Sequence, residues 1–244
     1  MNKNVSLLAI SYVFGFTAAT ITVFLSGIIG SQIASIKSLA TLPTALTVVG
    51  TAVFAALAAK IMSKIGRKLG FILASLASSI TCLLAAYAIY DRNFILFCIA
   101  NLILGACMAF THQYRFAAAE SVEKDKAPKA ISIIMLSGIV AAFLGISSAN
   151  YTKDLFTDFQ YVGSYITLAI FMFMPTIFFS FYENKNTSET EFSKNHTGRS
   201  YFEIISQPRF LQAVIAAAFA YAIMSFLMTA TPMSMHLMEK MSLE

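Results

Sequence analysis

The stretch AAKIMSKIGRKLG at residues 58–70 decides how this chain folds, because four basic side chains interrupt two long apolar runs. Those side chains are Lys60, Lys64, Arg67 and Lys68. A charge at the centre of a membrane helix costs about 2.5 to 3.5 kcal/mol on insertion scales, so none of them belongs in hydrocarbon. We therefore expect both flanking helices to end here, in a hairpin between two membrane spans.

The hairpin resembles a motif of the major facilitator superfamily, G-x-x-x-D-R-x-G-R-R, which joins the second and third membrane helices of that family. Ala59 stands at the first glycine of the motif, and Ser63 stands at its aspartate. The aspartate of the family is thought to cap a helix and to pair with charges, and a serine retains only the capping ability. An ordinary basic loop is the alternative interpretation. The second half of the motif is intact, at Lys64, Gly66, Arg67 and Lys68.

The composition indicates an integral membrane protein. Of 244 residues, 58% are hydrophobic and 12% are charged, and the mean hydropathy is +0.73, which a soluble domain does not sustain. The net charge of +5 comes from residues in alternate short loops, so we expect the lipid bilayer as partner and no nucleic acid. Three cysteines lie in apolar runs without metal-ligand spacing, and neither a metal nor a cofactor is expected. They are Cys82, Cys98 and Cys107.

Seven apolar segments are long enough to cross a bilayer, which predicts an all-α polytopic helix bundle. Twelve Lys and Arg residues fall in the loops on the side of the N-terminus and four on the other side. The positive-inside rule then predicts a cytoplasmic N-terminus, in the inner membrane of the cell, with the first span retained. The spans are expected near residues 5–28, 38–61, 70–90, 94–119, 128–150, 161–182 and 209–231.

The fourth span carries most of the candidate site residues. His112 and Arg115 follow Asn101 by eleven and fourteen residues, which places all three within about 40° on one face of a continuous helix. An arginine in a membrane span is functional by default, and snorkelling to the membrane surface is the alternative. We expect these three residues and Gln113 to bind substrate or gate its path, with His112 available for proton coupling.

Two other spans add candidates. Tyr12 in the first span could line a cavity, and helix packing is the alternative role for it. Gly138 and Gly145 fall on one face of the fifth span, where residues without side chains let helices approach closely.

The whole layout resembles the N-terminal half of a major facilitator superfamily protein followed by the start of a second half. We expect a six-helix half at 1–182, a cytoplasmic linker with a short amphipathic segment at 183–208, and the first helix of an incomplete second half at 209–244. The resemblance implies secondary active transport of a small solute by alternating access. The missing half, or a second copy, would complete the solute path.

A branch of the superfamily also resembles this chain locally. The strings HQYRFAAAE at 112–120 and FLMTATPM at 226–233 are similar to bacterial permeases, some of which are suggested to carry riboflavin. The alternative function is a seven-helix receptor or sensor without transport, but a receptor normally places its N-terminus outside. Nothing in the sequence has the pattern of a nucleophile with its base, so no enzyme is expected.

Overall fold

The computed structural model describes residues 2–156, 159–184 and 206–237, and these are almost entirely helical. Seven stretches of the described chain are long and apolar enough to cross a membrane. This confirms the expected all-α multi-pass bundle. The helices are α1 (Lys3–Ile33), α2 (Leu42–Ile65), α3 (Arg67–Tyr90), α4 (Phe94–Thr111), α5 (Tyr114–Glu120), α6 (Ala127–Thr152), α7 (Val162–Ser180) and α10 (Pro208–Leu237).

The chain divides into two compact units. The first runs to Asn184 and contains α1 to α7, and the second contains α10. The described side chains of α10 are mostly exposed. Of the linker and amphipathic segment expected at 183–208, residues 185–205 lie outside the described residues.

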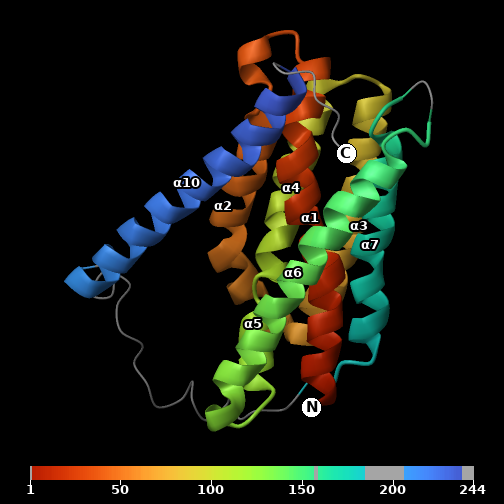
Figure 1. Cartoon of the computed structure of the whole chain (residues 1–244). Coiled ribbons are helices and arrows are strands. Elements are labelled where there is room, and N and C mark those ends of the chain that lie inside the picture. The colour runs from red at the N-terminus through yellow and green to blue at the C-terminus, as the bar shows by residue number, and fades with distance from the viewer. Residues whose placement is uncertain (1, 157–158, 185–205, 238–244) are drawn as a thin grey trace. The chain divides into compact units, whose positions relative to one another are not determined.

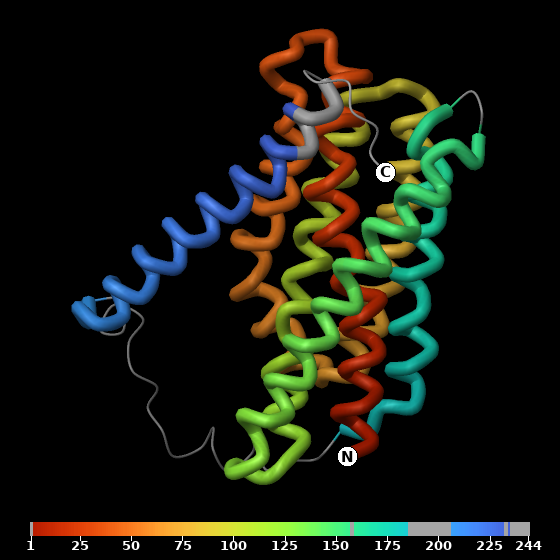
Figure 2. The backbone as a smooth tube through the Cα atoms, viewed as in Figure 1, coloured from red at the N-terminus to blue at the C-terminus, as the bar shows by residue number. Residues whose placement is uncertain are grey.

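Successive spans of the first unit run in alternate directions (Figure 1). The start of α1, the α2–α3 turn, the α5–α6 connection and the end of α7 all lie at one end, which we call the N-terminal end; the opposite end is the far end (Figure 2). The most extensive pairings are α2 with α4, α3 with α7 and α1 with α6. These three packed helix pairs form the frame of the first unit.

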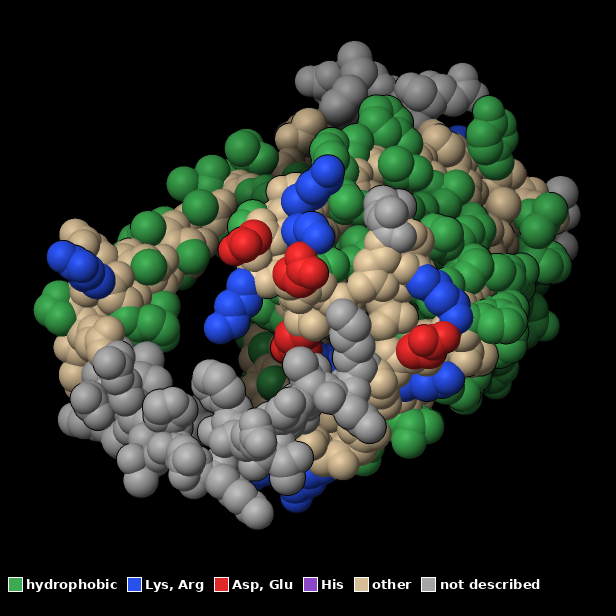
Figure 3. Space-filling view, turned by 90° about the horizontal axis from the view of Figure 1, so that it is seen from below, with side chains coloured by type: hydrophobic (Ala, Val, Ile, Leu, Met, Phe, Trp, Pro, Cys, Tyr) green, Lys and Arg blue, Asp and Glu red, His purple; other side chains and the backbone are tan. Residues whose placement is uncertain are grey.

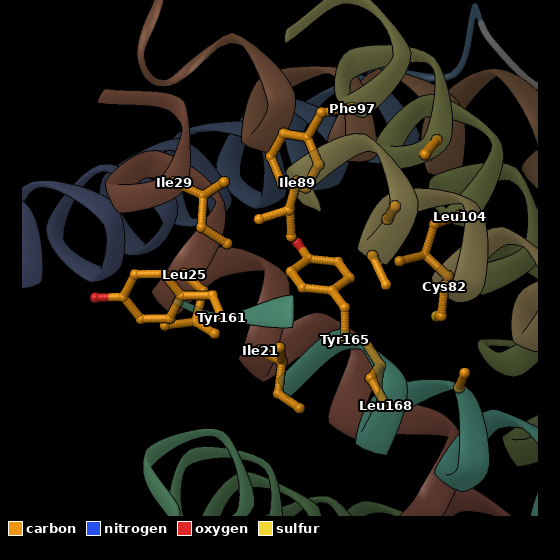
Figure 4. Packing of buried hydrophobic residues seen from close by; sticks show 14 of the residues in the cluster. Ile21, Leu25, Ile29, Cys82, Ile89, Phe97, Leu104, Tyr161, Tyr165 and Leu168 are labelled. Carbon is orange, nitrogen blue, oxygen red and sulfur yellow. The ribbon is translucent and has the colours of Figure 1, made fainter. Parts of the chain in front are cut away.

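A core of aliphatic and aromatic side chains fills the bundle between α1, α3, α4 and α7 (Figure 4). Tyr165 of α7 is fully buried in it, and its ring meets that of Phe97 edge-on at 5.6 Å. In a bilayer, close packing and interhelical hydrogen bonds hold helices together, because lipid chains are as apolar as the side chains. The fit of this core therefore matters more than its hydrophobicity.

Helices α2 and α4 approach each other closely through two glycines. A β-carbon on Gly105 would collide with the backbone carbonyl of Thr47, and one on Gly50 would collide with that of Leu102. The Thr51 hydroxyl also donates a hydrogen bond to the Gly105 carbonyl, at 3.0 Å. Backbone atoms cannot rotate aside as a side chain can, so larger residues here would separate the two helices.

The hairpin differs from the expected loop, because Gly66 alone separates the two helices. Lys60 and Lys64 lie in the last turns of α2, and α3 starts at Arg67. A helix can carry these charges because its final turns extend past the apolar part of the span, while its backbone stays hydrogen-bonded. Gly66 has φ 83° and ψ 160°, a conformation that is essentially restricted to glycine.

Replacing Gly66 with alanine should therefore lower the free energy of unfolding by about 1 to 3 kcal/mol. The added β-carbon forces the turn out of its backbone conformation. Thermal unfolding of the purified variant in detergent measures this loss, with Ala59→Gly, in the exposed last part of α2, as control for a glycine–alanine exchange. An unchanged midpoint for Gly66→Ala would contradict the assigned turn.

Candidate functional site

The fourth span is not the continuous helix expected over residues 94–119. Helix α4 ends at Thr111, and α5 starts at Tyr114 after a turn at His112 and Gln113. In this turn the amide of Gln113 bonds to the carbonyl of Phe110, three residues back, at 3.0 Å. Such tighter winding changes the direction of all later side chains, so one helical wheel does not describe both parts of the span.

The turn brings Tyr114 into the core and leaves Arg115 half-buried beside it. The Tyr114 ring packs edge-on against Phe71 at 4.7 Å and against Phe179 at 5.0 Å. Its hydroxyl bonds to Ser75 and Thr111. This buried tyrosine, which the sequence analysis did not select, anchors α5 against α3 and α7.

Tyr12, Phe16 and His112 form a group of aromatic side chains, and Arg115 lies within electrostatic range of Tyr12 and His112. We call these four residues the Arg115 cluster. Tyr12 stacks on Phe16 with ring centroids 5.0 Å apart, and Phe16 meets His112 edge-on at 6.2 Å. The cluster therefore joins α1 to the α4–α5 turn.

The Arg115 side chain has an unused hydrogen-bond donor. Its Nε is buried and has no hydrogen-bond partner within the described part of the chain. The guanidinium carbon lies 4.9 Å from the ring centroid of Phe116. A buried, unpaired donor on a charged group costs free energy, and a ligand with acceptor atoms would recover it.

Helix α6 covers the Arg115 cluster with a glycine. A β-carbon on Gly138 would lie 3.3 Å from the Tyr12 ring, and one on Gly145 would collide with the Thr20 hydroxyl. Both glycines thus face α1, and their missing side chains set the distance between the two helices. Tyr12 therefore lies between Gly138 and the aromatic side chains of α1 and α5.

Asn101 lies in a different place, about 21 Å along the span from Arg115 if each residue adds 1.5 Å. It is fully buried, and its amide oxygen accepts bonds from Ser26 at 3.2 Å and Thr47 at 3.3 Å. Ser26 is in turn 3.0 Å from the Tyr165 hydroxyl. This polar junction connects α1, α2, α4 and α7, so the structure does not bring Asn101 together with His112 and Arg115.

The hairpin motif makes its contacts at the N-terminal end. Arg67 pairs with Glu120 through Nε at 3.0 Å and through a second guanidinium nitrogen at 2.5 Å. The Lys68 ammonium donates to the Ser180 carbonyl at 2.7 Å. The position of Ser63 in the motif suggested a capping role. Ser63 does not cap α3, because its hydroxyl donates a hydrogen bond to the Lys60 carbonyl within α2.

The start of α1 is also held at the N-terminal end. Lys3 forms an ion pair with Glu183 at 2.6 Å, and the side-chain amide of Asn4 donates a hydrogen bond to the Glu183 carbonyl at 2.8 Å. The Asn2 side-chain oxygen accepts a hydrogen bond from the backbone N–H of Asn4 and so caps α1. Figure 3 views this end and shows basic and acidic side chains gathered together, with hydrophobic side chains on the adjacent flank.

The pKa of the Glu183 carboxyl is lowered by its hydrogen bond from Lys3 and by the charges of Lys3 and Lys68. A lowered pKa in the folded state means that the contact stabilises the fold at neutral pH. The stabilisation is lost as the pH falls below the usual value of 4.5 and through the folded-state pKa.

Lys3→Met should therefore lower the unfolding midpoint slightly at pH 7, and the difference from the wild type should shrink below about pH 4.5. The contact is exposed, so we expect a small effect. Thermal unfolding of both proteins across this pH range measures it, with Lys37→Met at the far end as control. A difference that grows on acidification would contradict the assigned pairing.

No three His, Cys, Asp or Glu side chains come together as a metal site among the described residues. The candidate site is the Arg115 cluster with Gly138 beside it, in the half of the bundle nearer to the N-terminal end.

Comparison with known proteins decides the family. The sequence profile described as Major Facilitator Superfamily matches residues 6–243. The chain belongs to the major facilitator superfamily. This confirms the resemblance seen at the hairpin, and it places the Arg115 cluster in a superfamily member with multiple membrane spans.

A relative within the superfamily is the riboflavin transporter RfnT of Brucella anthropi. It is 31% identical over 235 residues, which is 96% of this chain and 58% of the relative. The chain thus spans a little over half of the length of that curated relative. No solved structure matches.

Sequence reasoning missed two parts of these sites. Phe16 follows Tyr12 by four residues on α1, a spacing that brings two aromatic rings together on a helix and could have indicated the pair. No comparable signal pointed to the polar junction of Ser26, Thr47 and Tyr165. These residues lie on different helices, and their spacing in the sequence does not indicate that they meet.

Proposed function

We propose that this chain forms one half of a secondary active transporter for a small solute, with the Arg115 cluster as part of the solute's path. The observation that supports this most is the buried, unpaired Nε of Arg115 inside a membrane span. Charged groups within membrane spans are costly and are found on the paths of substrates and ions. The role is transport and not catalysis.

We propose riboflavin as the solute to test first. The relative named a riboflavin transporter supports this choice. The chemistry of the cluster also suits a flat heteroaromatic ring, because aromatic side chains offer stacking surfaces and Arg115 offers planar donors to ring carbonyls. His112, next to this arginine, is the group that we propose for proton coupling.

A second half, or a second copy of the chain, would provide the other wall of the path. The spans that contain α2 and α6 are only 22% buried within the structure, against 44 to 56% for those of α1, α3 and α4. From Ala52 to Leu57, α2 is exposed at every position. We propose that this surface and α6 pack against the second half.

The basic hairpin supports the proposed orientation, with the N-terminal end in the cytoplasm of the cell and the protein in the inner membrane. Lys60, Lys64, Arg67 and Lys68 all lie at this end, where the positive-inside rule places such a cluster.

Uptake of labelled riboflavin by bacteria that cannot synthesise it tests the function. The cells express this chain alone, or together with the part of RfnT that the similarity does not cover, or that part alone. We expect uptake when both parts are present, because alternating access requires two bundles. Uptake by cells that express the chain alone would mean that a second copy of the chain provides the other side of the solute path. The proposal would be contradicted if cells with both parts in the membrane took up no more riboflavin than cells with the RfnT part alone.

A further inference from the structure

A groove with a volume of about 570 Å³ lies at the far end of the bundle, between α3 and α7. It is separate from the Arg115 cluster, which lies towards the N-terminal end. Nine side chains line it, and only those of Tyr87 and Tyr90 carry a polar atom. A hydrophilic solute would find too few hydrogen-bonding partners there.

The groove extends from the end of α3 into its apolar part. Tyr90 is the last residue of α3, and Leu83 lies seven residues earlier, which corresponds to a depth of about 10 Å. Tyrosines concentrate where a bilayer meets water. The groove therefore begins at the level of the lipid headgroups and continues beside the acyl chains.

Apolar side chains of the segment after α6 form the opposite rim. Leu155 is 64% exposed and Phe156 is 43% exposed, although both are hydrophobic. Phe159 closes the wall by packing on Tyr90, with ring centroids 4.4 Å apart. These exposed side chains are continuous with the lipid-facing surface of α3, where Leu83 is 50% exposed.

We propose that this groove binds one phospholipid, with an acyl chain between α3 and α7 and the ester groups near the hydroxyls of Tyr87 and Tyr90. The groove opens sideways onto the hydrocarbon of a multi-pass membrane protein, so lipid is the apolar molecule that reaches it. A helix of another protein, 10 to 12 Å wide with side chains, is too bulky for a groove of this depth and volume.

Quenching of a single tryptophan tests the site, since the natural chain has none. Leu83→Trp places the reporter in the groove and keeps both tyrosine hydroxyls. Ile95→Trp, near the start of α4 and 72% exposed, places a control reporter near the same end but outside the groove. Each purified variant in dodecyl maltoside is titrated with dibrominated phosphatidylcholine, and the constant for lipid relative to detergent is fitted.

We expect a relative constant roughly fivefold or more higher at Leu83→Trp than at Ile95→Trp, a difference that a retained acyl chain can supply. Adding Leu155→Asp should lower the relative constant at the groove reporter to the value at the control reporter. The relative constant at Ile95→Trp should stay unchanged. Phe156→Asp serves the same purpose if the first substitution disturbs the elution profile. Equal constants at the two reporters, or a groove value that both aspartates leave unchanged, would overturn the proposal.

Discussion

Replacing Arg115 with alanine should lower riboflavin uptake roughly 10- to 100-fold, the range expected when charge-assisted hydrogen bonds to a bound solute are lost. Arg115→Lys keeps the charge but loses the planar set of donors, so it should also reduce uptake strongly. The measurement is the initial rate of riboflavin uptake, with the chain alone or together with the RfnT part, whichever is active. The rate is divided by the amount of the variant in the membrane.

Lys129→Ala, on the exposed first turn of α6, is the control and should transport normally. An arginine that only snorkels to the membrane surface would tolerate lysine. Wild-type uptake by both Arg115 variants would therefore remove this residue from the solute's path and leave α5 as a structural element.

Gly105→Ala should destabilise the fold by about 3 kcal/mol, the upper part of the range for overpacked cores. The reason is that its side chain would meet the Thr47 backbone, which cannot move without displacing α2. For a chain of this size the loss corresponds to a midpoint roughly 6 to 12 °C lower. Thermal unfolding in detergent is the measurement.

Gly138→Ala is the matched control. Its β-carbon would meet the ring of Tyr12 at 3.3 Å, and a ring at the edge of a cluster can shift by a few tenths of an ångström. We expect a much smaller change in its midpoint. An equal decrease of the unfolding midpoint in the two variants would show that α2 and α4 are not in closer contact than α1 and α6.

The sequence predicted the spans well because their signals are local. Length and hydropathy identified seven crossings, and the basic residues at 60–68 located the α2–α3 turn. The ends of the two helices at this turn were predicted less accurately. Charged residues indicate which part of the chain lies outside the hydrocarbon, but they do not indicate where the helical backbone ends. Here α2 continues past both of its lysines and ends at Ile65.

The role of the candidate site residues stays a prediction, and the structure bears only on where they lie. His112, Arg115 and Tyr12 lie in one cluster, although the prediction for the first two assumed a continuous helix. Neither proline nor glycine marks the break at His112 and Gln113, so it depends on how Tyr114 packs in the core. Asn101 was assigned to the same face, but its hydrogen-bond partners on α1 and α2 place it in a separate junction.

Protection of a cysteine at Gln113 tests the proposed binding of riboflavin at the Arg115 cluster. The natural cysteines are buried, which favours labelling at the introduced site. The rate of maleimide labelling of Gln113→Cys is measured in detergent with and without saturating riboflavin, with Lys37→Cys at the far end as control. We expect slower labelling at position 113 and no change at position 37. Equal rates at position 113 with and without riboflavin, in a variant that still takes up riboflavin, would contradict it.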